Sequence, residues 1–132
     1  MSNNTQNRIH NSTNHNQGTA MRVLCVCSAG LLRSPTTASV LNQHFGYNTR
    51  AAGIVKDYAL IPVDEVLLHW ADLVVFMEEE HKHLAEYLFG ELPENVVLNI
   101  PDRFKYGDAT LVALIKERFS AYVQERNNKN DK

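Results

Sequence analysis

The sequence of 132 residues has few cysteines, no long apolar run and no excess of basic residues. Cys25 and Cys27 are its two cysteines, and a single residue separates them, so they cannot form the disulfide framework of a small secreted domain. No apolar stretch approaches the roughly 20 residues that span a bilayer, and the N-terminus lacks the apolar stretch of a signal peptide. We therefore expect a cytoplasmic protein that does not associate with a membrane.

The charge and the composition exclude further classes of protein. A formal net charge of -2 argues against a general nucleic-acid-binding protein, although it is compatible with one local anion pocket. Hydrophobic residues make up 44% of the chain and charged residues 21%, which is typical of a single soluble domain. A domain of this size can bury a core without disulfide bonds.

The chain divides into a polar start, a patterned body and a polar end. Residues 1–20 consist mostly of Asn, Gln, Ser and Thr. Such a segment buries too little apolar surface to offset its ordering entropy, so we expect it to be disordered. Residues 21–126 show the alternation of a folded domain, and we expect a frayed C-terminus over residues 127–132.

Apolar patterns in the body predict alternating strands and helices. The predicted strands cover residues 22–26, 49–52, 73–77 and 95–100, and the predicted helices cover residues 34–45, 62–70, 79–89 and 109–123. Val63, Val66, Leu67 and Trp70 form the apolar stripe expected of the second helix. The alternation predicts an α/β fold, a single doubly wound domain with a parallel sheet and helices on both faces.

The segment after the first strand combines a cysteine, an arginine and a helix start. It begins at Cys27, reaches Arg33, and continues into Ser34 and Pro35, which are typical of the first residues of a helix. Ligands of parallel sheets bind outside the carboxyl ends of the strands. Backbone N–H groups of such a loop can surround an anion, and the helix adds the positive end of its dipole. The residues expected to bind phosphate are Ser28, Ala29, Gly30, Leu31, Leu32, Arg33 and Ser34.

This loop predicts a nucleophilic cysteine. The planar guanidinium of Arg33 can bind two phosphate oxygens at once, which the amine of a lysine cannot do. The positive field of the loop and helix favours the thiolate of Cys27, which can attack phosphorus and form a phosphocysteine. Ser34, besides capping the helix, can donate a hydrogen bond to this sulfur. The predicted reaction is the hydrolysis of a phosphate monoester without a metal or another cofactor.

The sequence resembles the low-molecular-weight protein tyrosine phosphatase family in three segments. These are VLCVCSAGLLRSPTTASVL at residues 23–41, WADLVVFMEEEH at residues 70–81, and IPDRFKYGD at residues 100–108. The chain looks closer to a compact bacterial or phage-type branch of this family. The resemblance implies a four-stranded parallel sheet in the order 2-1-3-4, a double displacement without a metal, and an aspartate general acid after the fourth strand. It also implies a phosphorylated protein or a small aryl phosphate as substrate.

The chain departs from the family pattern at several positions. Gly30 stands where family members usually carry an asparagine, and no histidine between Gly53 and Pro62 replaces the histidine that normally braces it. Leu32 replaces the second cysteine of the loop, so an in-loop disulfide cannot form. Arg103 replaces the usual proline after the acid. The chain is also shorter than typical members, which trims the walls that usually recognise phosphotyrosine.

Two aspartates compete for the role of general acid. Asp102 follows the fourth predicted strand, at the position where the resemblance implies the acid. Asp108 directly precedes the last helix and is better explained as its cap. We therefore predict that Cys27, Arg33 and Asp102 are the catalytic residues.

Other polar residues are explained by structure more simply than by chemistry. His81 and His83 are two positions apart and do not share a helix face. We interpret them, together with the glutamates 78–80, as a solvated helix start and not as a metal site. Glu78 occupies the acidic position that the family has after its third strand, which implies an indirect role at the site. Cys25 is interpreted as a buried apolar side chain.

Three other functions use a similar loop. An arsenate reductase needs a second thiol, and because no cysteine follows Cys27, an external thiol would have to provide it. A non-catalytic phosphate-binding module could retain the loop, but the joint presence of Cys27, Arg33, Ser34 and Asp102 argues against it. A phosphocysteine carrier of sugar transport has less need of the charge of Arg33.

Overall fold

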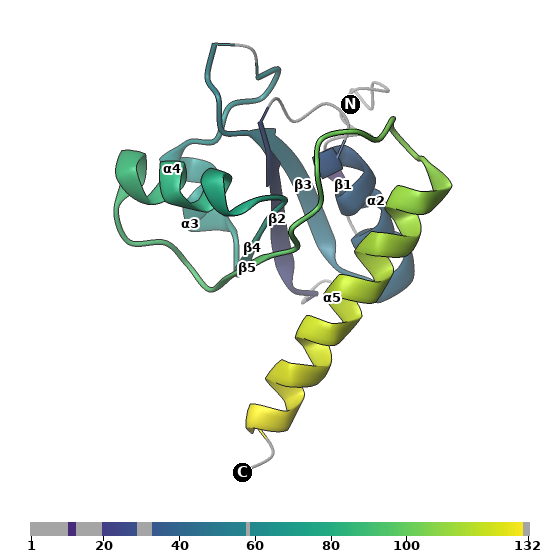
Figure 1. Cartoon of the computed structure of the whole chain (residues 1–132). Coiled ribbons are helices and arrows are strands. Elements are labelled where there is room, and N and C mark those ends of the chain that lie inside the picture. Colours follow the sequence, from purple (N-terminus) through teal and green to yellow (C-terminus); the bar gives the residue numbers. More distant parts are fainter. Residues whose placement is uncertain (1–10, 13–19, 29–32, 58, 131–132) are drawn as a thin grey trace, which may run out of the picture.

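A parallel sheet lies at the centre of the computed structural model, which describes residues 11–12, 20–28, 33–57 and 59–130 (Figure 1). Its parallel strands are β2 (Arg22–Cys27), β3 (Asn48–Gly53), β4 (Leu73–Phe76) and β5 (Asn95–Val97). In space they follow the order β3-β2-β4-β5. This is the predicted order 2-1-3-4, which is therefore confirmed.

A short strand that the sequence does not predict lies at one edge of the sheet. β1 (Asn11–Ser12) pairs antiparallel with β3 and falls within the segment 1–20, for which the composition predicts disorder. An edge strand is held by backbone N–H and C=O groups, so a polar composition is compatible with the pairing. Residues 1–10 and 13–19 lie outside the described residues.

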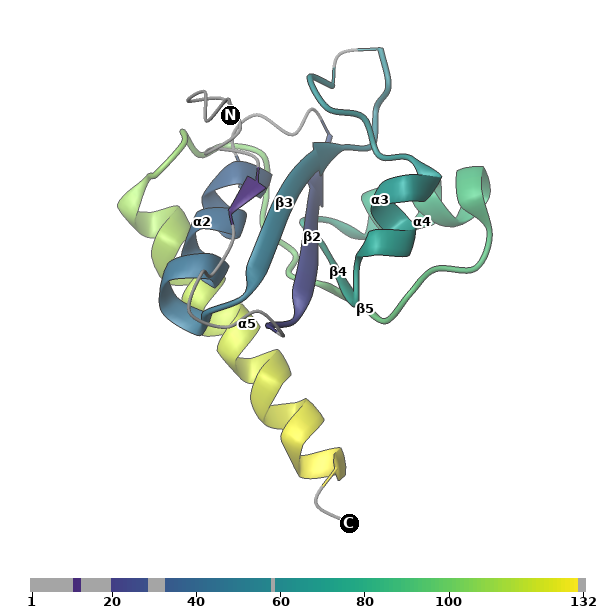
Figure 2. The same cartoon turned by 180° about the vertical axis from the view of Figure 1, so that it is seen from behind.

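Helices cover both faces of the sheet, as predicted. α2 (Arg33–Phe45) and α5 (Ala109–Asn130) lie on one face, and α3 (Glu65–Trp70) and α4 (Glu79–Phe89) lie on the other (Figures 1 and 2). Within the described ranges, none of the helices is both long enough and apolar enough to cross a bilayer.

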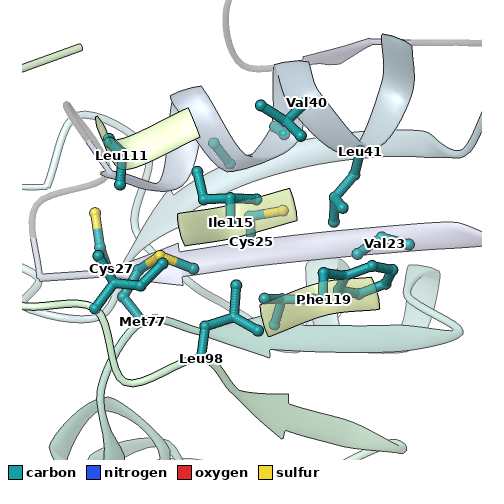
Figure 3. Packing of buried hydrophobic residues seen from close by; sticks show 14 of the residues in the cluster. Val23, Cys25, Cys27, Val40, Leu41, Met77, Leu98, Leu111, Ile115 and Phe119 are labelled. Carbon is teal, nitrogen blue, oxygen red and sulfur yellow. The ribbon is translucent and has the colours of Figure 1, made fainter. Parts of the chain in front are cut away.

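The alternation of side chains along β2 divides the core into two clusters. Val23, Cys25 and Cys27 pack in the cluster beneath α2 and α5, whereas Leu24 and Val26 pack in the cluster beneath α3 and α4. Figure 3 shows the first cluster, in which side chains of α5 lie over the strand. Both faces of β2 are therefore buried, which explains its continuous apolar sequence.

The predicted helix over residues 62–70 begins later than expected. Asp64 caps α3, because its carboxylate accepts the N–H of Leu67 at 2.8 Å, and the helix therefore starts at Glu65. Leu68 is buried on this short helix, whereas Val66 is 73% exposed. The predicted inward position of Val66 is therefore wrong, since the later helix start changes which residues face the sheet.

The last helix is longer than the sequence predicts. α5 continues to Asn130, past the predicted end at residue 123 and into the segment predicted to fray. Its final turns extend beyond the sheet in both views (Figures 1 and 2). Adding a residue to an existing helix gains one hydrogen bond for each residue that is fixed, so a polar sequence can extend the helix without packing against the core. Leu111, Ile115 and Phe119, which recur at helical spacing along one face of α5, are fully buried.

Candidate active site

The nucleophile candidate lies at the carboxyl end of the central strand. Cys27 is the last residue of β2 and is 4% exposed. Its carbonyl accepts the N–H of Ile54 at 2.9 Å, and the carbonyl of the next residue, Ser28, accepts the N–H of Val55 at 3.0 Å. These bonds tie the start of the phosphate loop to the segment that follows β3.

Ser34 contacts the cysteine, but it does not cap the helix. α2 begins at Arg33, so Ser34 is already inside the helix and the predicted cap is wrong. Its hydroxyl oxygen lies 3.1 Å from the sulfur of Cys27, and the hydroxyl donates to the carbonyl of Ala52 at 3.4 Å. Ser34 is fully buried. The predicted proximity to the sulfur is therefore confirmed. The buried hydroxyl contacts both the Cys27 sulfur and the carbonyl of Ala52 in β3.

Arg33 is a buried cation surrounded by oxygen atoms. Its side chain is 2% exposed, Nη1 donates to the carbonyl of Ile100 at 2.8 Å, and the same nitrogen forms an ion pair with Glu78. Nε lies 3.7 Å from Oδ1 of Asp102. A buried charge is tolerated only when it is paired and hydrogen-bonded, so these partners fix the guanidinium. Glu78 contacts Arg33 and acts on the site through the arginine, in keeping with the indirect role that the resemblance implies.

The two aspartates after β5 have different surroundings. Asp102 lies beside Arg33 with a side chain that is 63% exposed, so its carboxyl can meet an incoming ligand. Asp108 accepts the N–H of Thr110 at 2.8 Å and that of Leu111 at 3.4 Å. The predicted cap role of Asp108 is confirmed, and Asp102 is the aspartate that lies near the arginine.

His81 is the residue at this site that the sequence analysis misses. The interpretation as a solvated helix start is wrong, because His81 is 2% exposed. Nε2 of its ring lies 3.0 Å from the hydroxyl of Ser28, and Nδ1 accepts the N–H of Glu78 at 3.2 Å. His83 is 70% exposed and fits the predicted solvated position. A histidine at the third position of a helix is one signal that could have indicated this contact, since a residue there can accept the N–H of the capping residue.

Burial shifts the pKa of two side chains near the site, His81 and Cys25, in opposite directions. Burial lowers the pKa of His81, the nearby charge of Arg33 lowers it further, and the carboxylates of Glu78, Glu80 and Asp102 oppose this effect. Burial also raises the pKa of Cys25, with a smaller contribution from Cys27. Cys25 is fully buried, which confirms its interpretation as an apolar side chain.

Four of the predicted phosphate-binding residues cannot be placed. Ala29, Gly30, Leu31 and Leu32 lie outside the described residues. Of the predicted site residues that are described, the structure brings Cys27, Arg33, Ser34 and Asp102 together at the end of β2, with Ser28 at the entrance of the loop. Among the described residues, no group of three or more histidine, cysteine, aspartate or glutamate side chains is arranged to hold a metal ion.

Comparison with solved structures identifies similar folds. Wzb of Vibrio vulnificus in complex with benzylphosphonate has a TM-score of 0.61 at 19% identity, over 80% of this chain and 99% of that chain. The YwlE arginine phosphatase of Geobacillus stearothermophilus has a TM-score of 0.60 at 20% identity, over 83% and 96% of the two chains. A low-molecular-weight protein tyrosine phosphatase of Bacillus subtilis has a TM-score of 0.59 at 21% identity, over 80% and 98%.

The sequence by itself matches no family model, and it matches no curated protein. The likeness therefore lies in the arrangement of strands and helices, and it extends over nearly the whole length of the similar structures. The resemblance indicated by the three sequence segments is confirmed at this level: the chain has the fold of the low-molecular-weight protein tyrosine phosphatases.

Proposed function

We propose that the protein is a cysteine-dependent phosphomonoester hydrolase of the tyrosine phosphatase type. The observation that supports the proposal most is that the Cys27 sulfur, at the carboxyl end of β2, lies against Ser34 in the first turn of α2, while the guanidinium of the preceding residue, Arg33, lies 3.7 Å from the Asp102 carboxyl. A nucleophile, a planar cation and an exposed acid are the groups that hydrolysis through a phosphocysteine requires.

In the first half of the reaction, the thiolate of Cys27 attacks the phosphorus atom of the ester. The sulfur–phosphorus bond forms while the bond from phosphorus to the leaving oxygen breaks, and Asp102 gives its proton to that oxygen. Arg33 binds the phosphate oxygens and stabilises their charge. Because Glu78 and the Ile100 carbonyl already hold the guanidinium, less conformational entropy is lost in orienting it when the substrate binds.

In the second half, water attacks the phosphocysteine. Asp102, now a carboxylate, accepts a proton from the water while the water oxygen bonds to phosphorus. The sulfur–phosphorus bond breaks, and Cys27 leaves as a thiolate that the Ser34 hydroxyl can stabilise from 3.1 Å. The cycle ends with inorganic phosphate and the original states of Cys27 and Asp102.

The first test is turnover of para-nitrophenyl phosphate in the presence of EDTA. We expect the wild-type protein to hydrolyse it, vanadate to inhibit competitively, and Cys27→Ser to be inactive, because an alcohol at this position is not appreciably ionised. Near-normal activity of pure Cys27→Ser protein would show that the mechanism is wrong. Phosphate binding without turnover would indicate a non-catalytic module, and thiol-dependent reduction of arsenate would indicate an arsenate reductase.

The substrate that we propose is phosphotyrosine in a protein or a small aryl phosphate. Tyr106, on the segment that carries Asp102, is 50% exposed, whereas Phe104 of the same segment is buried in the core. An exposed aromatic ring four positions after the acid in sequence is a candidate contact for the ring of an aryl phosphate. The experiment is a comparison of kcat/KM for phosphotyrosine, phosphoserine and phosphoarginine peptides of the same sequence. A preference for phosphoarginine would replace the proposed substrate while leaving the cysteine mechanism intact.

A further inference from the structure

We propose that His81 is a positioning residue that links Ser28, near the start of the phosphate loop, to the arginine at its end. The inference rests on the function proposed above, because it concerns how the same loop is held ready for phosphate. It assigns a role to a buried histidine that is not itself among the groups that would touch the substrate.

A continuous series of contacts joins the two ends of the loop. The ring of His81 lies 3.0 Å from the hydroxyl of Ser28 and accepts the backbone N–H of Glu78 at 3.2 Å. The carboxylate of Glu78 forms an ion pair with Arg33. Ser28 and Arg33 are the residues on either side of segment 29–32. The N-terminus of α4 therefore connects Ser28, just after the end of β2, to Arg33 at the beginning of α2.

The hydrogen bonds define the tautomer of His81. Because Nδ1 accepts the N–H of Glu78, it carries no proton, and the neutral ring carries its proton on Nε2. Nε2 therefore donates to the hydroxyl oxygen of Ser28, whose own proton can serve another acceptor. A protonated ring would direct a second N–H toward the N–H of Glu78 and would lose that bond.

The surroundings of the ring favour this neutral form. Burial and the charge of Arg33 both disfavour an imidazolium, while the carboxylates of Glu78, Glu80 and Asp102 favour it less strongly. A neutral, buried ring with both nitrogens engaged has one orientation, so it can define the position of Ser28.

A loop that binds phosphate through its backbone benefits from fixed ends. Ordering a backbone residue costs roughly 1–2 kcal/mol of conformational entropy, and this cost reduces affinity unless it is met before the ligand binds. Gly30 offers no side chain for a hydrogen bond within the loop. The contact between His81 and Ser28 provides a brace from outside the loop instead.

Two substitutions separate the two nitrogens of the ring. In His81→Asn the short amide can still accept the N–H of Glu78 but cannot reach Ser28. In His81→Gln the longer amide can place a donor near Ser28. His83→Asn is the matched control, because His83 is on the same helix, is 70% exposed, and pairs only with the exposed Glu79, at 3.7 Å, in the described part of the chain.

The measurement is the concentration of inorganic phosphate that protects Cys27 from iodoacetamide, followed by mass spectrometry. We expect His81→Asn to need about tenfold more phosphate, as is common when one hydrogen bond of a binding site is lost. His81→Gln should stay within about threefold of wild type, and His83→Asn should match wild type. Wild-type protection in His81→Asn would overturn the proposal, and so would an equal loss in the Asn and Gln variants, since that would indicate packing and not donation to Ser28.

Ser28→Ala removes the same contact from the other side. We expect it to weaken phosphate protection as much as His81→Asn does, and the double variant to be no weaker than either single variant. Losses that multiply in the double variant would show that the two residues act independently and would overturn the proposal. If circular dichroism shows that His81→Asn does not fold, Ser28→Ala decides: wild-type protection in that variant would also overturn it.

The protection assay does not depend on turnover, so the two proposals can fail separately. A wild-type protein that binds phosphate with the expected dependence on His81 but hydrolyses no ester would refute the phosphatase and leave the positioning role intact. An active phosphatase in which His81→Asn binds phosphate normally would refute the positioning role alone. Nitrogen-15 NMR adds a direct check, because a proton on Nδ1 of His81 at neutral pH would contradict the proposed tautomer.

Discussion

The hydroxyl oxygen of Ser34 lies 3.1 Å from the sulfur of Cys27, and the same hydroxyl donates to the carbonyl of Ala52 at 3.4 Å. A hydroxyl has one proton, so it can donate to only one of these groups at a time. Beside a thiol, the Ser34 hydroxyl can donate to Ala52 while its oxygen accepts the S–H. Beside a thiolate, the hydroxyl turns to the sulfur. The pair can therefore follow the charge of Cys27 without any movement of the backbone.

Removing this hydroxyl should slow the breakdown of the phosphocysteine. We expect Ser34→Ala to lower kcat by roughly 10–100-fold, the range that corresponds to a hydrogen bond to a charged group. Rapid mixing with para-nitrophenyl phosphate should show a burst of nitrophenol, because the phosphocysteine would then form faster than it breaks down. Ser39→Ala, on the same helix, is the control for the loss of a hydroxyl. A kcat of wild-type size in Ser34→Ala would contradict this role.

The shape of the Arg33 side chain should matter as well as its charge. Arg33→Lys keeps one positive charge but loses the planar fork and cannot contact Ile100, Glu78 and phosphate together. We expect kcat/KM for aryl phosphates to fall roughly 10²–10³-fold, the cost of losing one donor that stabilises a transition state. Arg103→Lys, an exposed arginine on the neighbouring segment, should change little. If Arg33→Lys has wild-type rates, the arginine lies outside the site.

The contribution of Asp102 should depend on the leaving group. Asp102→Asn should slow the hydrolysis of phosphotyrosine by roughly 10²–10⁴-fold, the usual share of acid catalysis. The loss should be smaller for para-nitrophenyl phosphate, because nitrophenolate is stable without a proton. The measurement is kcat for a series of aryl phosphates whose phenols differ in acidity. An equal loss for all leaving groups would show that Asp102 does not protonate them.

Asp108 provides the matched comparison for this acid. Asp108→Ala removes the bonds to the first N–H groups of α5, so the free energy of unfolding should fall by about 1 kcal/mol. Urea denaturation monitored by circular dichroism measures this change. The dependence on the leaving group should remain as in wild type. Should that dependence change in Asp108→Ala and not in Asp102→Asn, the two roles would have to be exchanged.

His81 should make stability depend on pH in the mildly acidic range. Its pKa in the folded protein lies below the ordinary value of 6.5, chiefly because of burial. Between these two pKa values the unfolded chain binds more protons than the folded protein, so the free energy of unfolding falls as the pH is lowered from 6.5 toward the folded-state pKa. Above pH 6.5, both states keep the His81 ring neutral, and the folded protein has the full stability that this neutral ring allows.

Urea denaturation at a series of pH values measures this effect. We expect His81→Gln to lose the part of the slope that lies below the unfolded-state pKa, because its amide does not titrate. His83→Gln should keep the slope, since His83 is largely exposed. A wild-type slope in His81→Gln would show that another group is responsible.

Much of the fold follows from patterns that are local in the sequence. Alternating apolar runs predict the parallel strands, and the family resemblance supplies their order. The residues Leu111, Ile115 and Phe119, at helical spacing, mark the buried face of α5. Asp108 caps the helix that directly follows it. Such features are predictable because a period or a cap depends on neighbouring residues only.

The site is predictable in part for the same reason. Cys27, Arg33 and Ser34 belong to one short segment between a strand and a helix, so their proximity follows from the chain itself. The face of α3 is not predictable in this way: the bond from Leu67 to Asp64 sets the helix start, and Val66 becomes exposed although it fits the apolar stripe. Several starts are compatible with the same stripe, and one capping bond selects among them.

Only the tertiary structure decides what His81 and Glu78 do. His81 contacts Ser28 across 53 positions of sequence, and Glu78 contacts Arg33 across 45. From its sequence, the segment around them is a charged helix start, which is normally solvated. β2 and β4 pair in parallel, so their carboxyl ends lie at the same edge of the sheet. The start of α4, which follows β4, therefore lies beside Ser28 and Arg33. The sequence determined the chemistry of the loop, and the sheet determined which side chains support it, since contacts between distant segments depend on how the strands pair.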